Sequence, residues 1–261
     1  MYYKEYGETN SALMVFIHGG GVSGWMWDKQ IEYFSSKFHC LVPEMPEHGR
    51  SKNGVQFTIC DAASELNELI KEKGKGKRVI AIGFSLGAQV LIAMLSQKPN
   101  LIDFAMINSA LVKKVPFANT LTKSMMFAFP LVKLKTFSKI QAKSMYINGD
   151  YQDIYYLESC RMNKDAFIRI MNENMSFKIP KNFKDSSSKI LVTAGEKERK
   201  IMKDSMKEIM ESNSNCKGLI VASIGHGFPL AMPKLFNATL EEWIENDVII
   251  ANQTNSYTIL D

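Results

Sequence analysis

The strongest structural signal in this chain is the stretch RVIAIGFSLG, residues 78–87. Its first part is continuously apolar after Arg78, as in a parallel strand buried on both faces, and predicts a strand over Arg78–Phe84. Its second part has the form G-x-S-x-G around Ser85 and leads into a helical pattern, Ser85–Gln97, that ends before Pro99. A glycine-flanked serine between a strand and a helix predicts a sharp turn that lifts the serine hydroxyl above the sheet edge.

Strand and helix patterns alternate along the chain on both sides of this stretch. The predicted strands are Ala12–Ile17, Phe38–Val42, Arg78–Phe84, Phe104–Asn108, Ile190–Ala194 and Leu219–Ala222. The predicted helices are Trp25–Lys37, Cys60–Lys73, Ser85–Gln97, Met202–Met210 and Pro229–Glu245. Such alternation implies a largely parallel sheet covered by helices on both faces. The predicted fold class is therefore α/β, with a mostly parallel central sheet.

One long segment, residues 110–188, interrupts this alternation. It holds no buried strand pattern, but it holds Met-rich and aromatic helical patterns around Met125 and between Met162 and Met171. Because a structureless loop of this length is unusual in a compact domain, we expect a helical cap or lid insertion that lines a pocket. The core domain is then expected over residues 1–109 and 189–261, and the polar tail Asn246–Asp261 is expected to fray.

Composition and charge are those of an ordinary globular protein. The 261 residues are 46% hydrophobic and 23% charged, which excludes disordered and low-complexity chains. The net charge is +5, but 27 of the 32 basic residues are Lys and they are scattered, so we expect no nucleic-acid partner. No apolar run approaches the ~20 residues that span a bilayer, so we expect no membrane partner.

The cysteines and the nucleotide motifs bear on cofactors. Cys40, Cys60, Cys160 and Cys216 stand far apart and form no C-x-x-C pair, which argues against zinc and thioredoxin-like redox sites. The chain has no P-loop and no G-x-G-x-x-G motif. We therefore expect a cytoplasmic protein with free thiols that acts on a small molecule without a metal or organic cofactor. Nothing in the sequence predicts the oligomeric state.

Candidate side chains exist for the three roles of nucleophilic catalysis. Ser85 is the candidate nucleophile, because the turn exposes its hydroxyl and the next helix N-terminus favours negative charge there. A hydroxyl needs a base, and His226, in a glycine-flanked loop after the last predicted strand, is the candidate. An imidazole needs an orienting carboxylate. The loop GEKER, residues 195–199, offers Glu198 first and Glu196 as its competitor.

Together with the turn HGGG at residues 18–21, these motifs resemble those of the α/β-hydrolase fold superfamily, in its small cap-bearing serine hydrolase branch. The resemblance covers essentially the whole chain. Its order of nucleophile, acid and base corresponds here to Ser85, Glu198 and His226.

The resemblance also implies the groups that stabilise an oxyanion. These are the backbone N–H groups of Gly20 and Leu86, with Gly21 as the alternate donor if the loop is shifted by one residue. His18 is then a structural residue near the oxyanion loop and is not catalytic.

Two segments depart from the family pattern. Where similar proteins carry D-x-P-G-H-G-x-S, this chain reads EMPEHGRS over residues 44–51, so that Glu44 replaces Asp and Glu47 replaces the first glycine. In some relatives the acid follows the strand before the cap. Asn108 and Ser109 occupy that place here and carry no carboxylate, which favours Glu198.

The resemblance implies a two-step acyl transfer through an acyl-enzyme on Ser85. We expect hydrolysis of a carboxylic ester, and the Met and aromatic residues of the insertion favour an apolar one. C–C bond hydrolysis and lactone hydrolysis use the same three residues and are the alternatives within hydrolase chemistry. A ligand receptor or signalling protein of the same fold is the non-enzymatic alternative.

Overall fold

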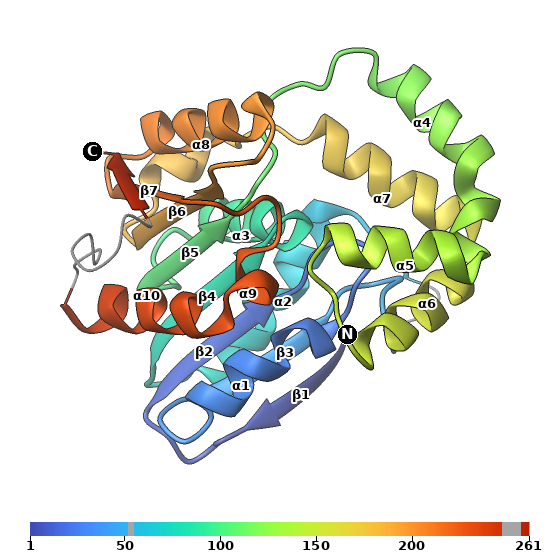
Figure 1. The fold of residues 1–261 in the computed structure, drawn as a ribbon. Helices are drawn as coiled ribbons and strands as arrows, with labels where there is room; N and C mark the ends of the chain where they lie inside the picture. Colours follow the sequence, from blue (N-terminus) through green and yellow to red (C-terminus); the bar gives the residue numbers. More distant parts are fainter. Residues whose placement is uncertain (52–54, 247–256, 261) are drawn as a thin grey trace.

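The centre of the sheet is β4 (Arg78–Phe84), whose residues after Arg78 are all buried. It pairs in parallel with β2 (Ala12–Ile17) on one side and with β5 (Phe104–Asn108) on the other. All three strands have the predicted boundaries. The structure, a computed structural model, describes residues 1–51, 55–246 and 257–260 (Figure 1).

In the described residues, eight strands form one sheet in the order β1-β3-β2-β4-β5-β6-β7-β8. The pairs from β3 to β7 are parallel, and β1 and β8 add antiparallel edges. The remaining strands are β1 (Tyr2–Tyr6), β3 (His39–Glu44), β6 (Lys189–Gly195), β7 (Cys216–Val221) and β8 (Tyr257–Leu260). This arrangement confirms the predicted α/β class with a mostly parallel sheet.

The two edge strands are absent from the sequence prediction. β8 corrects the expectation of a frayed tail for residues 257–260, which pair with β7, whereas residues 247–256 lie outside the described ranges. Strands this short show too few residues for a period-two pattern. They form because the free backbone groups of β3 and β7 need hydrogen-bond partners.

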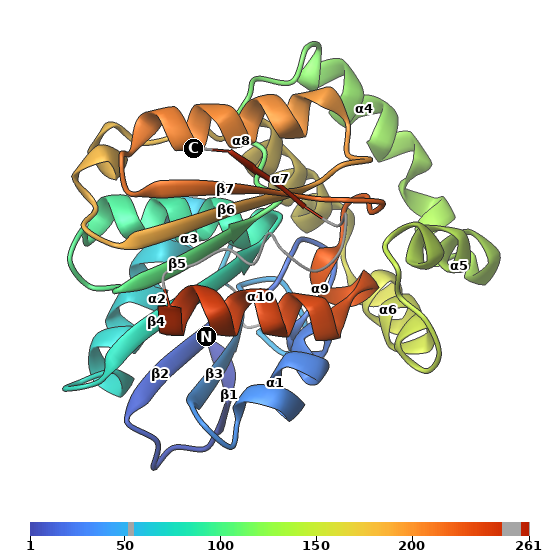
Figure 2. The same ribbon diagram turned by 60° about the vertical axis from the view of Figure 1, so that its left-hand side comes forward.

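Helices cover both faces of the sheet (Figure 2). Leu13 of β2 points into one apolar core, which it shares with Leu66 of α2 and Ile209 of α8. Phe16 of β2, on the opposite face, belongs to a second core with Trp243 of α10. The helices of these two layers are α1 (Asp28–Phe34), α2 (Ile59–Lys73), α3 (Leu86–Gln97), α8 (Lys200–Ser212), α9 (Phe228–Ala231) and α10 (Pro233–Asn246).

Two helices predicted as continuous are divided in the structure. Trp25–Lys37 becomes a short 3-10 helix, η1 (Gly24–Trp27), followed by α1. All four residues of η1 are buried, whereas an α-helix on a core surface buries only one side. Pro229–Glu245 becomes α9 and α10, because Pro233 lacks an N–H group and disfavours helical backbone in the preceding residue.

Between β5 and β6 the chain forms four helices and no strand, and all of these residues are described. They are α4 (Ala118–Ala128), α5 (Lys135–Ser144), α6 (Tyr151–Arg161) and α7 (Lys164–Ser176), with 3-10 helices η2 (Phe129–Lys133) and η3 (Lys181–Asp185). α4 packs on α7 and α5 packs on α6, and the four lie together at one side of the sheet (Figures 1 and 2). Within the described ranges, no helix has the length and apolar character needed to cross a membrane.

Candidate active site

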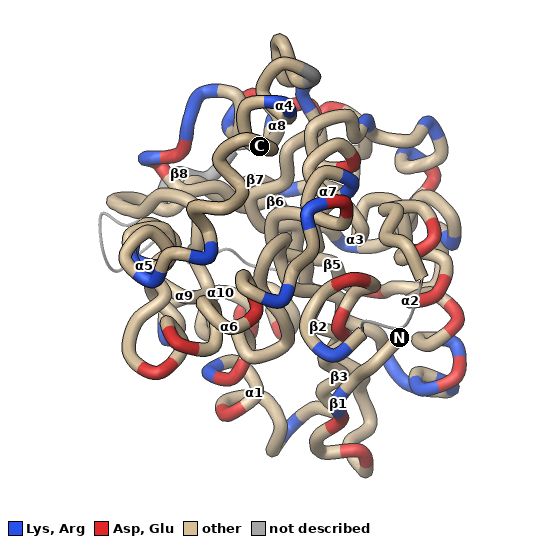
Figure 3. The backbone as a smooth tube through the Cα atoms, turned by 90° about the vertical axis from the view of Figure 1, so that its right-hand side faces the viewer, with Lys and Arg blue, Asp and Glu red and all other residues tan. Residues whose placement is uncertain are grey.

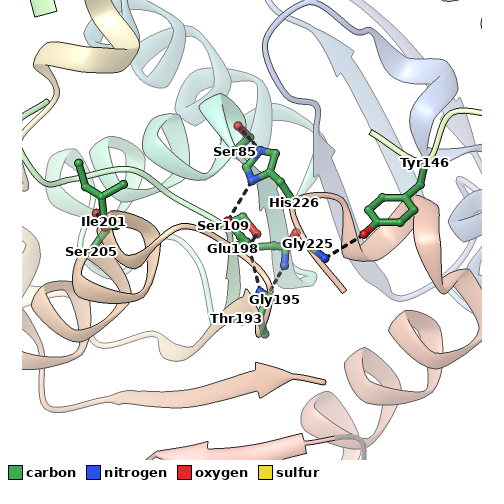
Figure 4. A network of polar contacts seen from close by, with 11 residues as sticks. Ser85, Ser109, Tyr146, Thr193, Gly195, Glu198, Ile201, Ser205, Gly225 and His226 are labelled. Atoms are coloured by element: carbon green, nitrogen blue, oxygen red, sulfur yellow. Dashed lines mark hydrogen bonds and ion pairs between the residues drawn. The ribbon is translucent and has the colours of Figure 1, made fainter. Parts of the chain in front are cut away.

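The sequence-predicted site residues follow four parallel strands. Gly20 comes after β2, Ser85 after β4, Glu198 after β6 and His226 after β7. Because the strands are parallel, their carboxyl ends meet at one edge of the sheet, which is where open α/β sheets bind ligands. The structure brings Ser85, His226 and Glu198 into one chain of contacts there (Figure 4).

Ser85 sits in a strained turn that only glycine neighbours permit. Its backbone has φ 54° and ψ −113°, an unfavourable conformation for a residue with a side chain, which costs about 1–3 kcal/mol. A Cβ atom on Gly83 would lie 2.5 Å from the carbonyl oxygen of Gly87. A Cβ atom on Gly87 would collide with the carbonyl oxygens of Ile17 and His18. The helix α3 consequently begins at Leu86, one residue later than predicted.

The His226 ring connects the serine to the acid. Its Nε2 atom lies 2.9 Å from Ser85 Oγ, and its Nδ1 atom lies 3.1 Å from Glu198 Oε2. An ionised carboxylate only accepts hydrogen bonds, so the Nδ1–H donates to Glu198 and Nε2 is left to accept the serine proton. The ring also packs on Phe84, with centroids 4.9 Å apart, and its side chain is partly exposed to solvent.

Glu198 is buried and fully hydrogen-bonded. Its Oε1 atom accepts from the Ser109 hydroxyl at 2.6 Å and from the Gly195 N–H at 2.9 Å, while Oε2 faces His226. Burial acts to raise the pKa of the Glu198 carboxyl, but hydrogen bonds from His226, Ser109 and Gly195 outweigh it and hold the pKa below its usual range. Glu198 is therefore a carboxylate that faces the imidazole at neutral pH.

The competing acid, Glu196, lies outside this chain of contacts. Its side chain is exposed and accepts the backbone N–H of Ser223 at 2.8 Å. Ser109, which the sequence analysis had noted only for lacking a carboxylate, stands at the alternative acid position and donates to Glu198 instead. No sequence motif marks this serine, because its contact depends on β5 and β6 lying side by side.

Gly20 and Leu86, whose amides form the predicted oxyanion hole, lie close together. A Cβ atom on Gly20 would lie 3.4 Å from Leu86 Cδ2, whereas one on Gly21 would meet nothing within 4 Å. Leu86 is the first residue of α3, so its N–H has no intrahelical partner. Gly20 rather than Gly21 is thus the residue placed against the start of α3.

His18 anchors the oxyanion loop to the segment after β3. Its Nε2 atom accepts the Met45 N–H at 2.9 Å, and its Nδ1 atom lies 2.7 Å from the Gly19 carbonyl oxygen, to which it donates. The ring is fully buried beside His48. Burial and the neighbouring His48 lower the pKa of His18 to about 3, so the ring is neutral and holds backbone groups rather than a ligand.

Glu47, which replaces a family glycine, has a backbone conformation that suits glycine better than a residue with a side chain. Its φ is 64°, in the left-handed region that glycine adopts most easily. Its carboxylate accepts two hydrogen bonds from the Arg169 guanidinium of α7, at 2.7 and 3.0 Å, and one from the Phe57 N–H. The departure from the family pattern therefore places an ion pair between this turn and α7.

Within the described residues, no group of three or more His, Cys, Asp and Glu side chains is arranged to hold a metal ion. The polar groups gathered at the sheet edge are instead a hydroxyl, an imidazole, a carboxylate and two backbone amides. Such a set can deprotonate an alcohol and stabilise a negative oxygen.

Comparison with known proteins places this chain in a family. The family described as "alpha/beta hydrolase fold" matches residues 12–147, and the chain belongs to it. An AB hydrolase superfamily protein of Gibberella zeae is 32% identical over 101 residues, which are 38% of this chain and 36% of that protein. A pimeloyl-[acyl-carrier protein] methyl ester esterase of Nitrosomonas europaea is 29% identical over 90 residues, 34% of each chain.

The match to these curated relatives is partial, since this chain spans only 36% and 34% of their lengths. The likeness of fold extends much further. An esterase from Exiguobacterium antarcticum superimposes with a TM-score of 0.80 over 94% of this chain and 95% of that one, at 14% sequence identity. The shared fold is therefore that of an α/β hydrolase over nearly the full length.

Proposed function

We propose that the protein hydrolyses a carboxylic ester, with Ser85 as nucleophile, His226 as general base and Glu198 as orienting acid. The observation that supports this most is the unbroken chain from Ser85 Oγ to His226 at 2.9 Å and on to Glu198 at 3.1 Å. The esterase names among the similar proteins favour an ester over other acyl substrates.

In the first step the Ser85 oxygen attacks the ester carbonyl while His226 Nε2 takes the hydroxyl proton. The carbonyl oxygen becomes negative and is held by the N–H groups of Gly20 and Leu86 at the start of α3. Removing one such donor typically costs about 3 kcal/mol of barrier, which is on the order of a hundredfold in rate. The buried Glu198 carboxylate stabilises the imidazolium that forms.

In the second half of this step His226 returns the proton to the alcohol oxygen as the C–O bond breaks, which leaves an acyl group on Ser85. Water then attacks the acyl-enzyme with His226 again as base, and collapse of the second intermediate releases the acid. No group outside the described side chains and backbone amides is needed to balance the protons.

We also propose that residues 110–188 act as a cap on a core formed by 1–109 and 189–261. Two contacts support this role. The Tyr146 hydroxyl accepts the Gly225 N–H at 2.9 Å, next to His226, and Glu158 accepts the hydroxyl of Ser23 at 2.6 Å. The insertion is thereby tied to the loops that hold the base and the oxyanion donor.

The proposal is tested with p-nitrophenyl esters of graded acyl length. Ser85→Ala should lower kcat by about 10⁴-fold or more, because it removes the attacking oxygen. Ser124→Ala, an exposed serine of α4, is the matched control and should leave the rate unchanged. A fluorophosphonate probe should label the wild type and the control, but not Ser85→Ala.

Two outcomes contradict this function. Equal rates for wild type and Ser85→Ala would show that Ser85 is not the nucleophile. A slow single turnover with stably bound product would instead favour a ligand receptor built on the same fold.

A further inference from the structure

A cavity of about 360 Å³ lies between the oxyanion loop and the helices α6 and α7. Gly21 and His48 line it from the core, and Arg161, Met162 and Arg169 line it from the insertion. Gly21 adjoins Gly20, the proposed oxyanion donor. The cavity therefore lies beside the oxyanion loop, and neither Ser85 nor Leu86 is part of its wall.

The wall of this cavity favours the acyl part of an ester over its leaving alcohol as the occupant. A leaving alcohol must reach His226 to receive its proton. Neither His226 nor its flanking residues line this cavity, whereas the oxyanion loop does. What fills the cavity is then the part of the substrate that remains on Ser85.

Both carboxylates in the cavity wall have protein donors. Glu47 is held by the Arg169 guanidinium and the Phe57 N–H. Glu158 accepts from the Ser23 hydroxyl at 2.6 Å and the Trp25 indole N–H at 2.9 Å. Since their acceptor oxygens are engaged, neither needs a cation from a ligand.

Arg161 is the charged group of the wall that has no hydrogen-bonded partner among the described residues. Burial raises the pKa of Glu158, and the Arg161 charge opposes this rise without an ion pair between the two side chains. Arg161 ends α6 and is exposed, and it makes no hydrogen bond or ion pair with any other residue in the part of the chain that the structure describes. A guanidinium carries five N–H donors in a planar fork that matches a carboxylate. Arg161 therefore has N–H donors that an anionic group of a ligand could fill as the acceptor.

The charge of the insertion points the same way. Residues 110–188 hold 13 Lys and Arg against 6 Asp and Glu, whereas the rest of the chain holds 19 against 21. The positive charge of the protein is thus concentrated in the helices over the site, and Figure 3 shows basic residues on both α5 and α7. A field of this sign attracts anionic substrates.

The cavity also has an apolar part. Met162, which follows α6, and Ala166 of α7 line it together with Val22 and Val55 of the core. These side chains suit methylene groups, which bury apolar surface without needing polar partners.

We propose that the substrate is a half-ester of a dicarboxylic acid, whose methylene chain packs on Met162 and Ala166 and whose free carboxylate binds Arg161. This inference rests on the proposed ester hydrolysis and names its substrate class. It also refines the expectation of an apolar substrate, which then holds only for the middle of the acyl chain.

Mono-p-nitrophenyl adipate, compared with the p-nitrophenyl ester of adipic acid monoamide, tests this subsite. The two differ only in a terminal carboxylate or carboxamide. Wild-type kcat/KM should be at least tenfold higher for the ester with the free carboxylate than for the ester with the carboxamide, and added salt should reduce this preference. Arg161→Gln should lower the ratio of these two kcat/KM values at least tenfold. It should keep kcat/KM for the carboxamide ester within twofold of the wild-type value. Lys164→Gln, an exposed change outside the cavity, is the control and should keep the wild-type ratio.

A separate binding measurement does not depend on turnover. Titration calorimetry should detect binding of adipate to the Ser85→Ala variant. A double variant with Ser85→Ala and Arg161→Gln should show no such binding. Equal hydrolysis of both esters through Ser85, with no adipate binding, overturns the carboxylate subsite alone. If neither ester is hydrolysed while adipate binds, the proposed ester hydrolysis fails and the anion site stands.

Discussion

Two glutamates in one loop after β6 have opposite surroundings. Glu198 is buried and binds His226, Ser109 and Gly195, while Glu196 is exposed and binds only the backbone of Ser223 among the described residues. A carboxylate that orients an imidazole must hold one tautomer and stabilise its charged form. At the scale of single residues, burial and contact thus separate two side chains that the sequence left as competitors.

We expect Glu198→Gln to lower kcat by about 10³-fold or more, because an amide can donate to Nδ1 and favour the wrong tautomer. Glu196→Gln should stay within about twofold, since its contact is to exposed backbone. Both rates are measured with the same p-nitrophenyl ester, and the melting temperature of each variant serves as the control for folding. Loss of activity in Glu196→Gln with retention in Glu198→Gln would show that the acid is misassigned.

Motif reasoning found the residues whose chemistry requires a fixed local geometry. Ser85 lies in a turn that needs glycines on both sides, and His226 lies in a glycine-flanked loop after a strand. Ser109 could not be found in this way. It meets Glu198 because Asn108 pairs with Thr193 across β5 and β6, and a pairing register of this kind is set by the whole sheet.

At the scale of elements, strands and helices with a local sequence pattern could be predicted, whereas those defined by pairing with distant segments could not. β4 and β5 have their predicted bounds because a buried parallel strand is apolar throughout. β8 has no such pattern and is defined by pairing with β7. The prediction of two continuous helices was wrong at η1 and at Pro233. At η1 all four residues are buried, and at Pro233 the missing N–H group ends the preceding helix.

The contact between the insertion and the His226 loop gives a prediction at this scale. Tyr146 follows α5, accepts the Gly225 N–H at 2.9 Å, and has ring atoms that would lie 3.0 Å from a Cβ on Gly227. It therefore holds both neighbours of His226 without touching the reacting atoms. Tyr146→Phe removes one hydrogen bond, worth about 0.5–1.5 kcal/mol, and should lower kcat by about two- to tenfold with KM nearly unchanged.

Tyr156→Phe is the matched control, because its hydroxyl binds the Lys133 carbonyl on the exposed side of the insertion. It loses a comparable hydrogen bond far from the base and should keep the wild-type kcat. Steady-state kinetics of the two variants separate positioning from general weakening of the insertion. Equal kcat values for both would argue that Tyr146 has only a structural role.

At the scale of the whole molecule, two buried histidines make stability depend on pH. His18 and His48 are both 2% exposed or less, and burial lowers the pKa of each, in His18 to about 3. In the unfolded chain both rings have a pKa near 6.5. Below that pH the unfolded state takes up protons that the folded state does not bind, so stability falls as pH drops.

The free energy of unfolding should therefore decrease between pH 7 and pH 5, by up to about 1.4 kcal/mol per pH unit for each histidine once the pH is below 6.5. Glu198, whose pKa is lowered, contributes only near and below the unfolded carboxyl value of about 4.3. Burial raises the pKa of Glu158, and this raised pKa makes the folded state more stable as the pH falls. The contribution of one histidine is therefore measured as the difference in pH dependence between wild type and a variant. Urea unfolding of wild type and His48→Gln at several pH values should give a shallower acid slope in the variant, because burial lowers the pKa of His48 and the variant lacks this ring. Parallel slopes would mean that His48 is not neutral in the folded protein.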